Sequence, residues 1–158
     1  MRKATIQDAS AIAEMLRASH ARSKYLGRAT ISEPVMQQTI AALIAAQGQI
    51  GPQGSCLFVV ERNGKIVAFI AGVLDRIYFF LSKLRATDIF LINQGGMASD
   101  TVRLVDAYTD WARSIRAVDE ITLSWSDAIP GAARISKLYA RKGFEQSGAI
   151  YELKGEMA

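Results

Sequence analysis

A tyrosine placed four residues before a Gly-Phe pair is the feature of this chain that most readily suggests chemistry. In the stretch KLYARKGFEQSGAIYEL, Tyr139 falls in the last turn of an expected helix, which Gly143 can end in a left-handed cap. A tyrosine hydroxyl can donate a proton to a leaving group in general acid catalysis. The alternative is that the Tyr139 ring packs beside Ile135 and Leu138 and that its hydroxyl is satisfied elsewhere.

A base to complement this acid is not identified by residue spacing. Four carboxylates lie on or beside expected strands, namely Glu61, Asp75, Asp88 and Asp127. Each could accept a proton through a water molecule, and no one of them is favoured by its position in the sequence. Exposed carboxylates are more often solvated charge than catalytic groups, so the identity of the base stays open.

Composition and charge narrow the classes of partner. The chain has 158 residues, half of them hydrophobic, which predicts one folded domain with a sizeable core. The net charge of +4 favours an anionic ligand. Because no stretch carries a dense run of Lys and Arg, nucleic-acid binding is not expected.

Single residues and interrupted apolar runs exclude further classes of site. Cys56 is the only cysteine and His20 the only histidine, so neither an intramolecular disulfide nor a zinc site is expected. Cys56 precedes a Leu-Phe-Val-Val run and is expected to be buried. An Asp-Arg pair separates the apolar runs 66–74 and 77–81, so no membrane span is expected. No signal peptide opens the sequence, and the expected compartment is the cytoplasm.

Hydrophobic periodicity and turn signals predict the element order β-α-α-β-β-β-α-β-α-β. Strands are expected at residues 2–6, 55–62, 65–74, 87–92, 120–125 and 144–154. Helices are expected after Asp8, from Thr30, over 99–116 and over 132–142. The predicted fold class is α/β (α+β): a single domain with a mixed, mostly antiparallel sheet of about six to seven strands and helices on both faces.

Two local signals support these boundaries. Asn63-Gly64 is the strongest two-residue hairpin signal, because both central turn positions need a positive φ. Thr30 and Glu33 have capping-box spacing, and Pro34 suits the first turn of the helix that follows them.

Two motifs within this order resemble the GNAT superfamily of acyl-CoA-dependent N-acetyltransferases. LYARKGF at 138–144 is similar to the family's LYxxxGF, and NGKIVAF at 63–69 is similar to its NGxxVG hairpin, with Ala68 where glycine is common. The resemblance covers essentially the whole chain. Segments 74–78 and 86–91 also resemble GNAT-like proteins of phage and prophage genomes.

The resemblance implies an enzyme that uses acetyl-CoA as co-substrate. A primary amine, on a small molecule or a peptide, would attack the thioester directly, and Tyr139 would protonate the departing thiolate. The last turn of its helix is then expected to face a cleft where the strands 87–92 and 120–125 splay apart.

The same resemblance implies a CoA site where the chain passes from a strand ending at Ile92 into a helix starting near Ser99. A helix N-terminus offers unpaired N–H groups and a positive dipole end, which suit a pyrophosphate. The candidate cofactor-binding residues are Leu91, Ile92, Gln94, Gly95, Gly96, Met97, Ala98, Ser99, Thr101 and Arg134.

This loop departs from the family pattern and resembles a degenerate version of it. The family's RGxGxG aligns with 96–101, which lacks the arginine and has Met97, Ser99 and Thr101 at the glycine positions. Ala132 stands where the family commonly has asparagine. The carboxylate of Asp100 is expected to repel a bound pyrophosphate, so Asp100→Asn would tighten binding.

These departures leave a second class of function open. The alternative to an N-acetyltransferase is a non-catalytic binding or assembly module that keeps the fold and has lost productive use of CoA. The acceptor is not identified by the sequence, and a homodimer stays open as an oligomeric state.

Overall fold

The computed structural model describes residues 1–153 and 155, and in it five strands form one mixed sheet in the order β1-β2-β3-β4-β5. The strands are β1 Arg2–Lys3, β2 Ser55–Arg62, β3 Lys65–Arg76, β4 Leu84–Asn93 and β5 Val118–Thr122. The helices are α1 Ala9–His20, α2 Glu33–Ala45, α3 Ala98–Arg113 and α4 Ile135–Arg141, with short 3₁₀ turns η1 Ile6–Asp8, η2 Ile77–Phe79 and η3 Ala132–Arg134. The predicted α+β class is confirmed.

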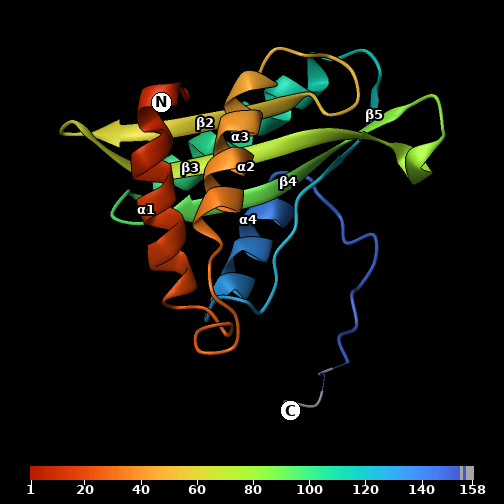
Figure 1. The fold of residues 1–158 in the computed structure, drawn as a ribbon. Helices are drawn as coiled ribbons and strands as arrows, with labels where there is room; N and C mark the ends of the chain where they lie inside the picture. The colour runs from red at the N-terminus through yellow and green to blue at the C-terminus, as the bar shows by residue number, and fades with distance from the viewer. Residues whose placement is uncertain (154, 156–158) are drawn as a thin grey trace.

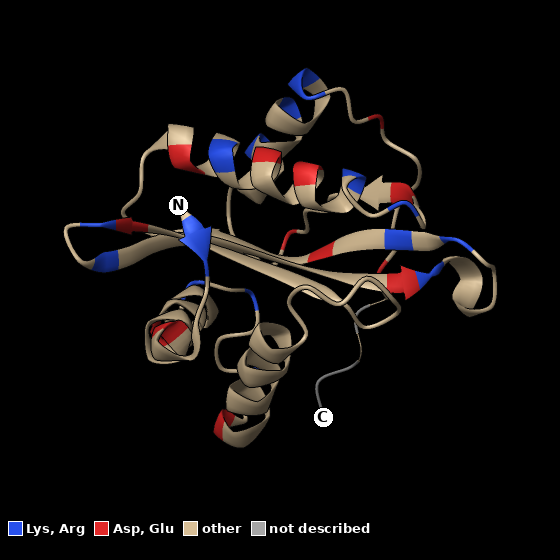
Figure 2. Cartoon of the chain, turned by 90° about the horizontal axis from the view of Figure 1, so that it is seen from above, with Lys and Arg blue, Asp and Glu red and all other residues tan. Residues whose placement is uncertain are grey.

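The sheet is antiparallel from β1 to β4 and parallel only between β4 and β5. Helices α1 and α2 cover one face and α3 and α4 the other (Figure 1; Figure 2 shows the same layers from above). Side chains alternate between these faces along the central strands, as strand geometry requires. In β3, Ile70 packs toward α3, whereas Phe69 and Ala71 pack toward α1 and α2.

The Asn63-Gly64 hairpin is confirmed. Both residues have positive φ, 50° and 74°, and Arg62 pairs directly with Lys65 in an antiparallel ladder. These are the dihedral signs that a two-residue turn needs to match the right-handed twist of the flanking strands. The hairpin therefore sets the pairing of β2 with β3 next to the turn, and a bulge between Val60 and Glu61 shifts the register farther along the two strands.

The end of α4 is also confirmed. Gly143 has φ 86°, its N–H donates to the carbonyl of Ala140, and the N–H of Phe144 donates to the carbonyl of Tyr139. This pair of bonds is a Schellman motif, which a glycine in the left-handed region allows without strain. The motif fixes Tyr139 in the final turn.

The prediction of six to seven strands was wrong, because residues 144–153 join no strand. Lys154, the last residue of the predicted strand, lies outside the described residues. A strand needs a partner edge as well as an apolar pattern, and Gly148 and Ser147 weaken the pattern within the segment. Residues 145–153 are instead exposed, and Glu152 pairs with Lys24 at 2.5 Å.

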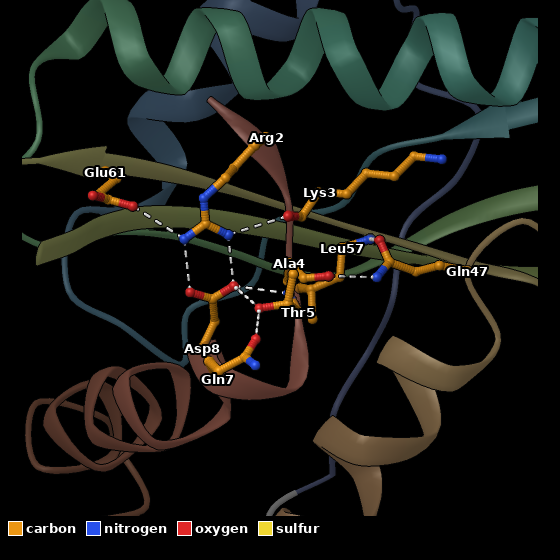
Figure 3. Close-up of polar contacts among 9 residues, drawn as sticks. All are labelled: Arg2, Lys3, Ala4, Thr5, Gln7, Asp8, Gln47, Leu57 and Glu61. Atoms are coloured by element: carbon orange, nitrogen blue, oxygen red, sulfur yellow. Dashed lines mark hydrogen bonds and ion pairs between the residues drawn. The ribbon is translucent and has the colours of Figure 1, made fainter. Parts of the chain in front are cut away.

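The first strand is shorter than predicted because a capping box turns the chain after Lys3. The carboxylate of Asp8 accepts the N–H of Thr5 at 2.8 Å and two bonds from the guanidinium of Arg2, at 2.7 and 2.8 Å. Arg2 also reaches Glu61 on β2 at 3.0 Å (Figure 3). Arg2 is the largest cause that holds the pKa of Asp8 at about 2.

Several other helix and strand boundaries differ from the predicted ones. The capping box predicted at Thr30 and Glu33 was wrong: α2 begins at Glu33, whose carboxylate binds the Arg17 guanidinium at 2.7 and 2.8 Å. Pro34 does lie in the first turn, as predicted. The expected strand 120–125 is β5, two residues earlier at its start and three shorter at its end.

Within the described residues, no helix is long and apolar enough to cross a membrane. The same part of the chain contains no group of three or more His, Cys, Asp or Glu side chains that could hold a metal ion. Cys56 is buried as predicted, and its burial raises the pKa of the thiol to about 12.

Candidate active site

The strands β4 and β5 part where the candidate acid lies. Their parallel ladder ends at the pair Thr87 and Thr122, while β4 continues to Asn93. On its other side, β4 carries a bulge: Gly72 pairs with Asp88 and Ala71 with Phe90, which leaves Ile89 as the extra residue. Bulges bend a strand and redirect side chains, and here the bulge lies at the point where β4 leaves β5.

Asp88 lies in this splay and reaches across it. One carboxylate oxygen accepts the backbone N–H of Ser124 at 2.8 Å and its hydroxyl at 3.1 Å. The residue is 6% exposed, and burial raises the pKa of the carboxyl above its usual value because no cation is among its hydrogen-bond partners. A carboxyl group with a raised pKa can take up and release a proton nearer to neutral pH than an exposed aspartate can.

Tyr139 meets the same segment from α4. Its hydroxyl donates to the carbonyl of Ser124 at 3.1 Å, and its ring lies 6.3 Å from that of Phe144. Burial, and then the charge of Asp88, raise the pKa of Tyr139. The phenol is therefore fully protonated at neutral pH, as a proton donor must be. The expected position of Tyr139 beside the splay of the two strands is confirmed, although its catalytic role stays a prediction.

A second tyrosine packs below the site. Tyr108 on α3 is fully buried and donates to the carbonyl of Thr122 at 2.8 Å. A Cβ at Gly72 would lie 2.5 Å from the Tyr108 ring, so the absence of a side chain there makes room for the ring. The sequence did not identify Tyr108 as a candidate site residue. Its hydrogen bond to the splay depends on tertiary packing.

The loop before α3 is held by the side chain of Asn93, which was not among the candidate residues, and by that of Gln94, which was. Asn93 accepts the N–H of Gly96 at 2.9 Å and donates to Met97 and Thr101, both at 3.0 Å. Gln94, a candidate CoA ligand, donates instead to α1, at the Met15 carbonyl and the Ser19 hydroxyl, both at 2.9 Å.

The expectation for Asp100 needs correction. Its side chain is fully buried, accepts two bonds of 2.8 Å from the guanidinium of Arg62 on β2, and accepts the N–H of Met97 at 2.8 Å. Arg62 is the largest cause that holds the pKa of Asp100 at about 2. The charge is therefore paired and does not face a ligand alone, and Asp100→Asn would disturb the loop that it was expected to improve.

Of the remaining candidates, Leu91 and Ile92 are half-buried in β4, while Met97, Ala98 and Ser99 are exposed at the start of α3. Within the described residues, the first-turn amides of Ala98 and Ser99 have no hydrogen-bond acceptor. The loop residue Gly95 and Arg134, at the end of η3, are also exposed. The open amides are what an anionic group at this helix end would use.

The structure separates the four candidate bases. Glu61 pairs with Arg2, Asp127 pairs with Lys24 at 2.7 Å, and Asp75 is exposed. Only Asp88 lies beside Tyr139. Its partner Ser124 is 36 residues away in the sequence, so no local pattern could have distinguished Asp88.

A shallow apolar groove opens on the other face of β4, between α1 and α2. Its volume is about 300 Å³, and its lining includes Leu16, His20, Val35, Met36 and Phe90. Phe90 is two residues past Asp88 on the bulged strand, so the groove adjoins the splay from the side opposite Tyr139.

Solved structures share this architecture over nearly the whole chain. AAC(6')-Iy in complex with the bisubstrate analogue CoA-S-monomethyl-acetylneamine has a TM-score of 0.70 at 11% identity, covering 99% of this chain and 97% of that one. A predicted acetyltransferase with acetyl-CoA from Clostridium acetobutylicum has a TM-score of 0.63 at 15% identity, covering 97% and 94%. A transcriptional regulator from Bacillus halodurans C-125 has a TM-score of 0.68 at 19% identity, covering 98% and 97%.

No protein-family model matches the sequence, and no curated protein matches it either. The structural likenesses establish the fold: the chain has the fold of GNAT acetyltransferases, as the sequence motifs predicted. At these identities they establish nothing finer, and the regulator among them shows that one fold serves differently named proteins.

Proposed function

We propose that this protein is an acyl-CoA-dependent N-acetyltransferase that acts on a small primary amine. The observation that carries the proposal is the convergence of Asp88 and Tyr139 on Ser124, at the splay of β4 and β5 in a GNAT fold. One group is a protonated phenol and the other a carboxyl with a raised pKa. Acyl transfer from a thioester to an amine needs one proton donor and one proton acceptor.

The proposed reaction is a direct displacement. The neutral amine nitrogen attacks the thioester carbonyl, the tetrahedral intermediate collapses, and the carbon–sulfur bond breaks. The amine proton passes to the carboxylate of Asp88, directly or through water, and the phenol of Tyr139 gives its proton to the departing thiolate. Products are the acetamide and free CoA; Asp88 then releases its proton to solvent, and Tyr139 regains one from solvent.

The pyrophosphate of CoA is proposed to bind at the start of α3. The open amides of Ala98 and Ser99 supply donors there, and the positive end of a sixteen-residue helix favours an anion. The ion pair with Arg62 offsets the negative charge of Asp100, which would otherwise repel the pyrophosphate. The arm of CoA would then run along Leu91 and Ile92 toward the splay. Gln94 is a brace to α1 in this proposal rather than a ligand.

The apolar groove between α1 and α2 is proposed to hold the body of the acceptor. Its lining is largely aliphatic and aromatic, and it carries no carboxylate. An amine with a compact apolar body therefore fits it better than a polycationic amine, which would need acidic partners.

Calorimetric titration with acetyl-CoA and CoA tests the first step. Binding of both, followed by thiol release with a panel of alkyl and aryl amines, is the expected result, with apolar amines turned over faster than polyamines. Absence of binding would favour the non-catalytic module. Binding without turnover on any amine would leave the CoA site and reject the acceptor class.

A further inference from the structure

The hairpin that joins β3 to β4 ends in a group of exposed apolar side chains, residues 78–81, here called the aromatic tip. Tyr78, Phe79 and Phe80 are 70%, 89% and 79% exposed, and Leu81 is 42% exposed. Figure 1 shows the tip projecting beyond the end of the sheet, between the arrowhead of β3 and the start of β4. A contiguous apolar group of this kind commonly marks an interaction site on a folded protein.

Hydrogen bonds hold the tip in one shape. The N–H of Ile77 donates to the carbonyl of Lys83, and the N–H of Leu81 donates to the carbonyl of Ile77, both at 3.1 Å. The Arg76 guanidinium donates to the carbonyl of Leu81 at 3.2 Å. Ile77 is buried and anchors the loop to the core. The aromatic side chains are therefore presented to solvent by an ordered loop.

The backbone of the tip is strained at two of its aromatic residues. Tyr78 and Phe79 have φ of 49° and 66°, a left-handed conformation that bulky residues adopt rarely and at a cost. Glycine or asparagine would adopt it more easily, so a loop that only connected two strands would be more stable with those residues. The strain therefore favours a role for the aromatic side chains themselves.

Cations lie at the base of the tip. From Asp75 to Arg85 the chain carries three cations and one carboxylate. Arg76 and Lys83 flank the tip and are exposed, and Lys83 has no ion-pair partner within the part of the chain that the structure describes. Arg85 pairs with Glu120 at 2.6 Å. The tip thus combines an apolar end with a positive base.

A second loop at this end of the sheet carries no charge. Residues 46–54, between α2 and β2, contain no Asp, Glu, Lys or Arg, and Ile50 among them is 72% exposed. The loop is tied to β3 just before the tip: the N–H of Gln53 donates to the carbonyl of Leu74, and the N–H of Leu74 donates to that of Gly54, both at 2.8 Å. This loop can approach an apolar surface without the desolvation of a charge.

We propose that the aromatic tip inserts into the surface of an anionic lipid bilayer, with Arg76 and Lys83 against the lipid phosphates. Aromatic side chains favour the boundary between headgroups and acyl chains, and each nearby cation adds attraction to an anionic leaflet. A standard protein interface buries about 20–30 residues a side, whereas the tip presents four apolar residues, so a protein partner fits it less well. Peripheral contact of this kind needs no spanning helix.

The location of the tip keeps this inference independent of the enzymatic proposal. β4 runs from the tip to the loop before α3, so the tip and the proposed CoA site lie at opposite ends of a ten-residue strand. Figure 2 shows the tip at the end of the sheet opposite the Asn63-Gly64 hairpin. A bilayer bound at the tip therefore leaves the start of α3 open, and the two kinds of binding can be measured separately.

Cosedimentation of the full chain with lipid vesicles tests the inference. Binding to phosphatidylcholine vesicles that contain about 30% phosphatidylserine should be at least about 10-fold stronger than binding to phosphatidylcholine alone. The double variant with Phe79→Asn and Phe80→Ser should weaken binding by at least about 30-fold, because two apolar side chains no longer insert. Its melting temperature should not fall, because asparagine tolerates a positive φ.

Two further variants separate charge from general stickiness. Lys83→Gln should weaken binding to the anionic vesicles by about 5-fold and leave binding to phosphatidylcholine unchanged. The matched control is the double variant with Ile150→Ser and Leu153→Ser, which changes two side chains that are 96% and 97% exposed outside the tip. It should leave binding within about 2-fold.

A single introduced cysteine separates insertion from mere contact. Cys56 is the only native cysteine, it is 2% exposed, and burial raises the pKa of its thiol to about 12, so it stays unlabelled. An environment-sensitive fluorophore on Phe80→Cys should shift its emission to the blue on anionic vesicles. The same fluorophore on Ile150→Cys should not shift.

Three results would overturn the inference: no binding to anionic vesicles, undiminished binding by the variant changed at Phe79 and Phe80, and no shift of the fluorophore at residue 80. If the protein bound no vesicles but associated with itself through contacts that this variant abolished, the tip would be a protein interface instead.

Discussion

Two buried aspartates, Asp100 and Asp88, have opposite pKa shifts because their hydrogen-bond partners differ. Asp100, at the start of α3, receives a bidentate guanidinium from Arg62, and its pKa is held at about 2. Asp88, in the splay of β4 and β5, receives only the N–H and hydroxyl of Ser124, and its pKa is raised. A buried charge with a cationic partner stays ionised, whereas one with neutral partners is poised to bind a proton.

This difference in hydrogen-bond partners and pKa gives Asp100 a structural role and makes Asp88 the candidate catalytic carboxylate. Asp100 and Arg62 tie the loop before α3 to the central hairpin, and Asn93 completes that bracing. Asp88 has a phenol next to it that shares the same serine. Carboxyl groups with raised pKa values collect at active sites, because proton transfer is fastest when the pKa lies near the working pH.

The largest effect is expected from Tyr139→Phe. If the hydroxyl protonates the thiolate, turnover should fall by roughly 10²–10⁴-fold with CoA affinity nearly unchanged. Tyr108→Phe is the matched control, because it also removes a phenol bound to a carbonyl near the splay. It should cost about 1 kcal/mol of stability and little turnover. Equal loss of turnover in both variants would assign Tyr139 a packing role.

Asp88→Asn should lower turnover by about 10²-fold, the lower end of the range for a general base. The asparagine oxygen can still accept the N–H of Ser124, so the splay keeps its geometry. The same variant should be more stable than the parent at neutral pH, since it no longer buries a carboxylate without a cation. Activity is measured by thiol release and stability by thermal unfolding. A variant with full activity would remove Asp88 from the mechanism.

The comparison also shows what the sequence could and could not predict. Asn63-Gly64 and Gly143 were identified because a turn and a helix cap are encoded within a few residues. Arg62 and Asp100 are 38 residues apart, and Asp88 and Ser124 are 36 apart, so both pairs arise only when the sheet assembles. Asp100 was accordingly expected to repel a ligand, and its paired state was missed.

The same limit explains the error at residues 144–153. Their loose alternation is a local signal for a strand, but strand formation depends on an available edge elsewhere in the fold. The motif around Tyr139 was more informative because its helix cap is formed by residues within five positions of Tyr139, although the apolar cluster around the ring also includes Val105 of α3. Its hydrogen bond to Ser124 was not, although the splay of the two strands was expected.

Arg62→Met tests the role of the ion pair between Arg62 and Asp100. Its expected effect, on the affinity for CoA, is smaller than the effects on turnover predicted above. Loss of the guanidinium leaves the Asp100 charge with Arg103, 3.7 Å away, as its nearest cation. CoA affinity should fall by about 10-fold through repulsion at the start of α3. Arg62→Lys keeps the charge without the bidentate geometry and should fall between the two. Calorimetry that finds equal affinity in all three proteins would place the pyrophosphate away from α3.

The smallest expected effect is a pair of opposite pH dependences of stability. Asp100 has a lowered pKa, so its contribution is fully present above its unfolded value of about 4 and is lost as pH falls toward 2. Asp88 has a raised pKa, so the folded state loses stability relative to Asp88→Asn as pH rises above about 4 and toward the folded pKa. The free energy of unfolding is measured with denaturant between pH 2 and pH 8 for the parent, Arg62→Met and Asp88→Asn. Relative to the parent, Arg62→Met should become less stable as the pH rises from acid to neutral, whereas Asp88→Asn should become more stable. If both variants changed stability with the same sign, the two aspartates would not be electrostatically distinct. Asp88 would then be no more favoured as the general base than any exposed carboxylate.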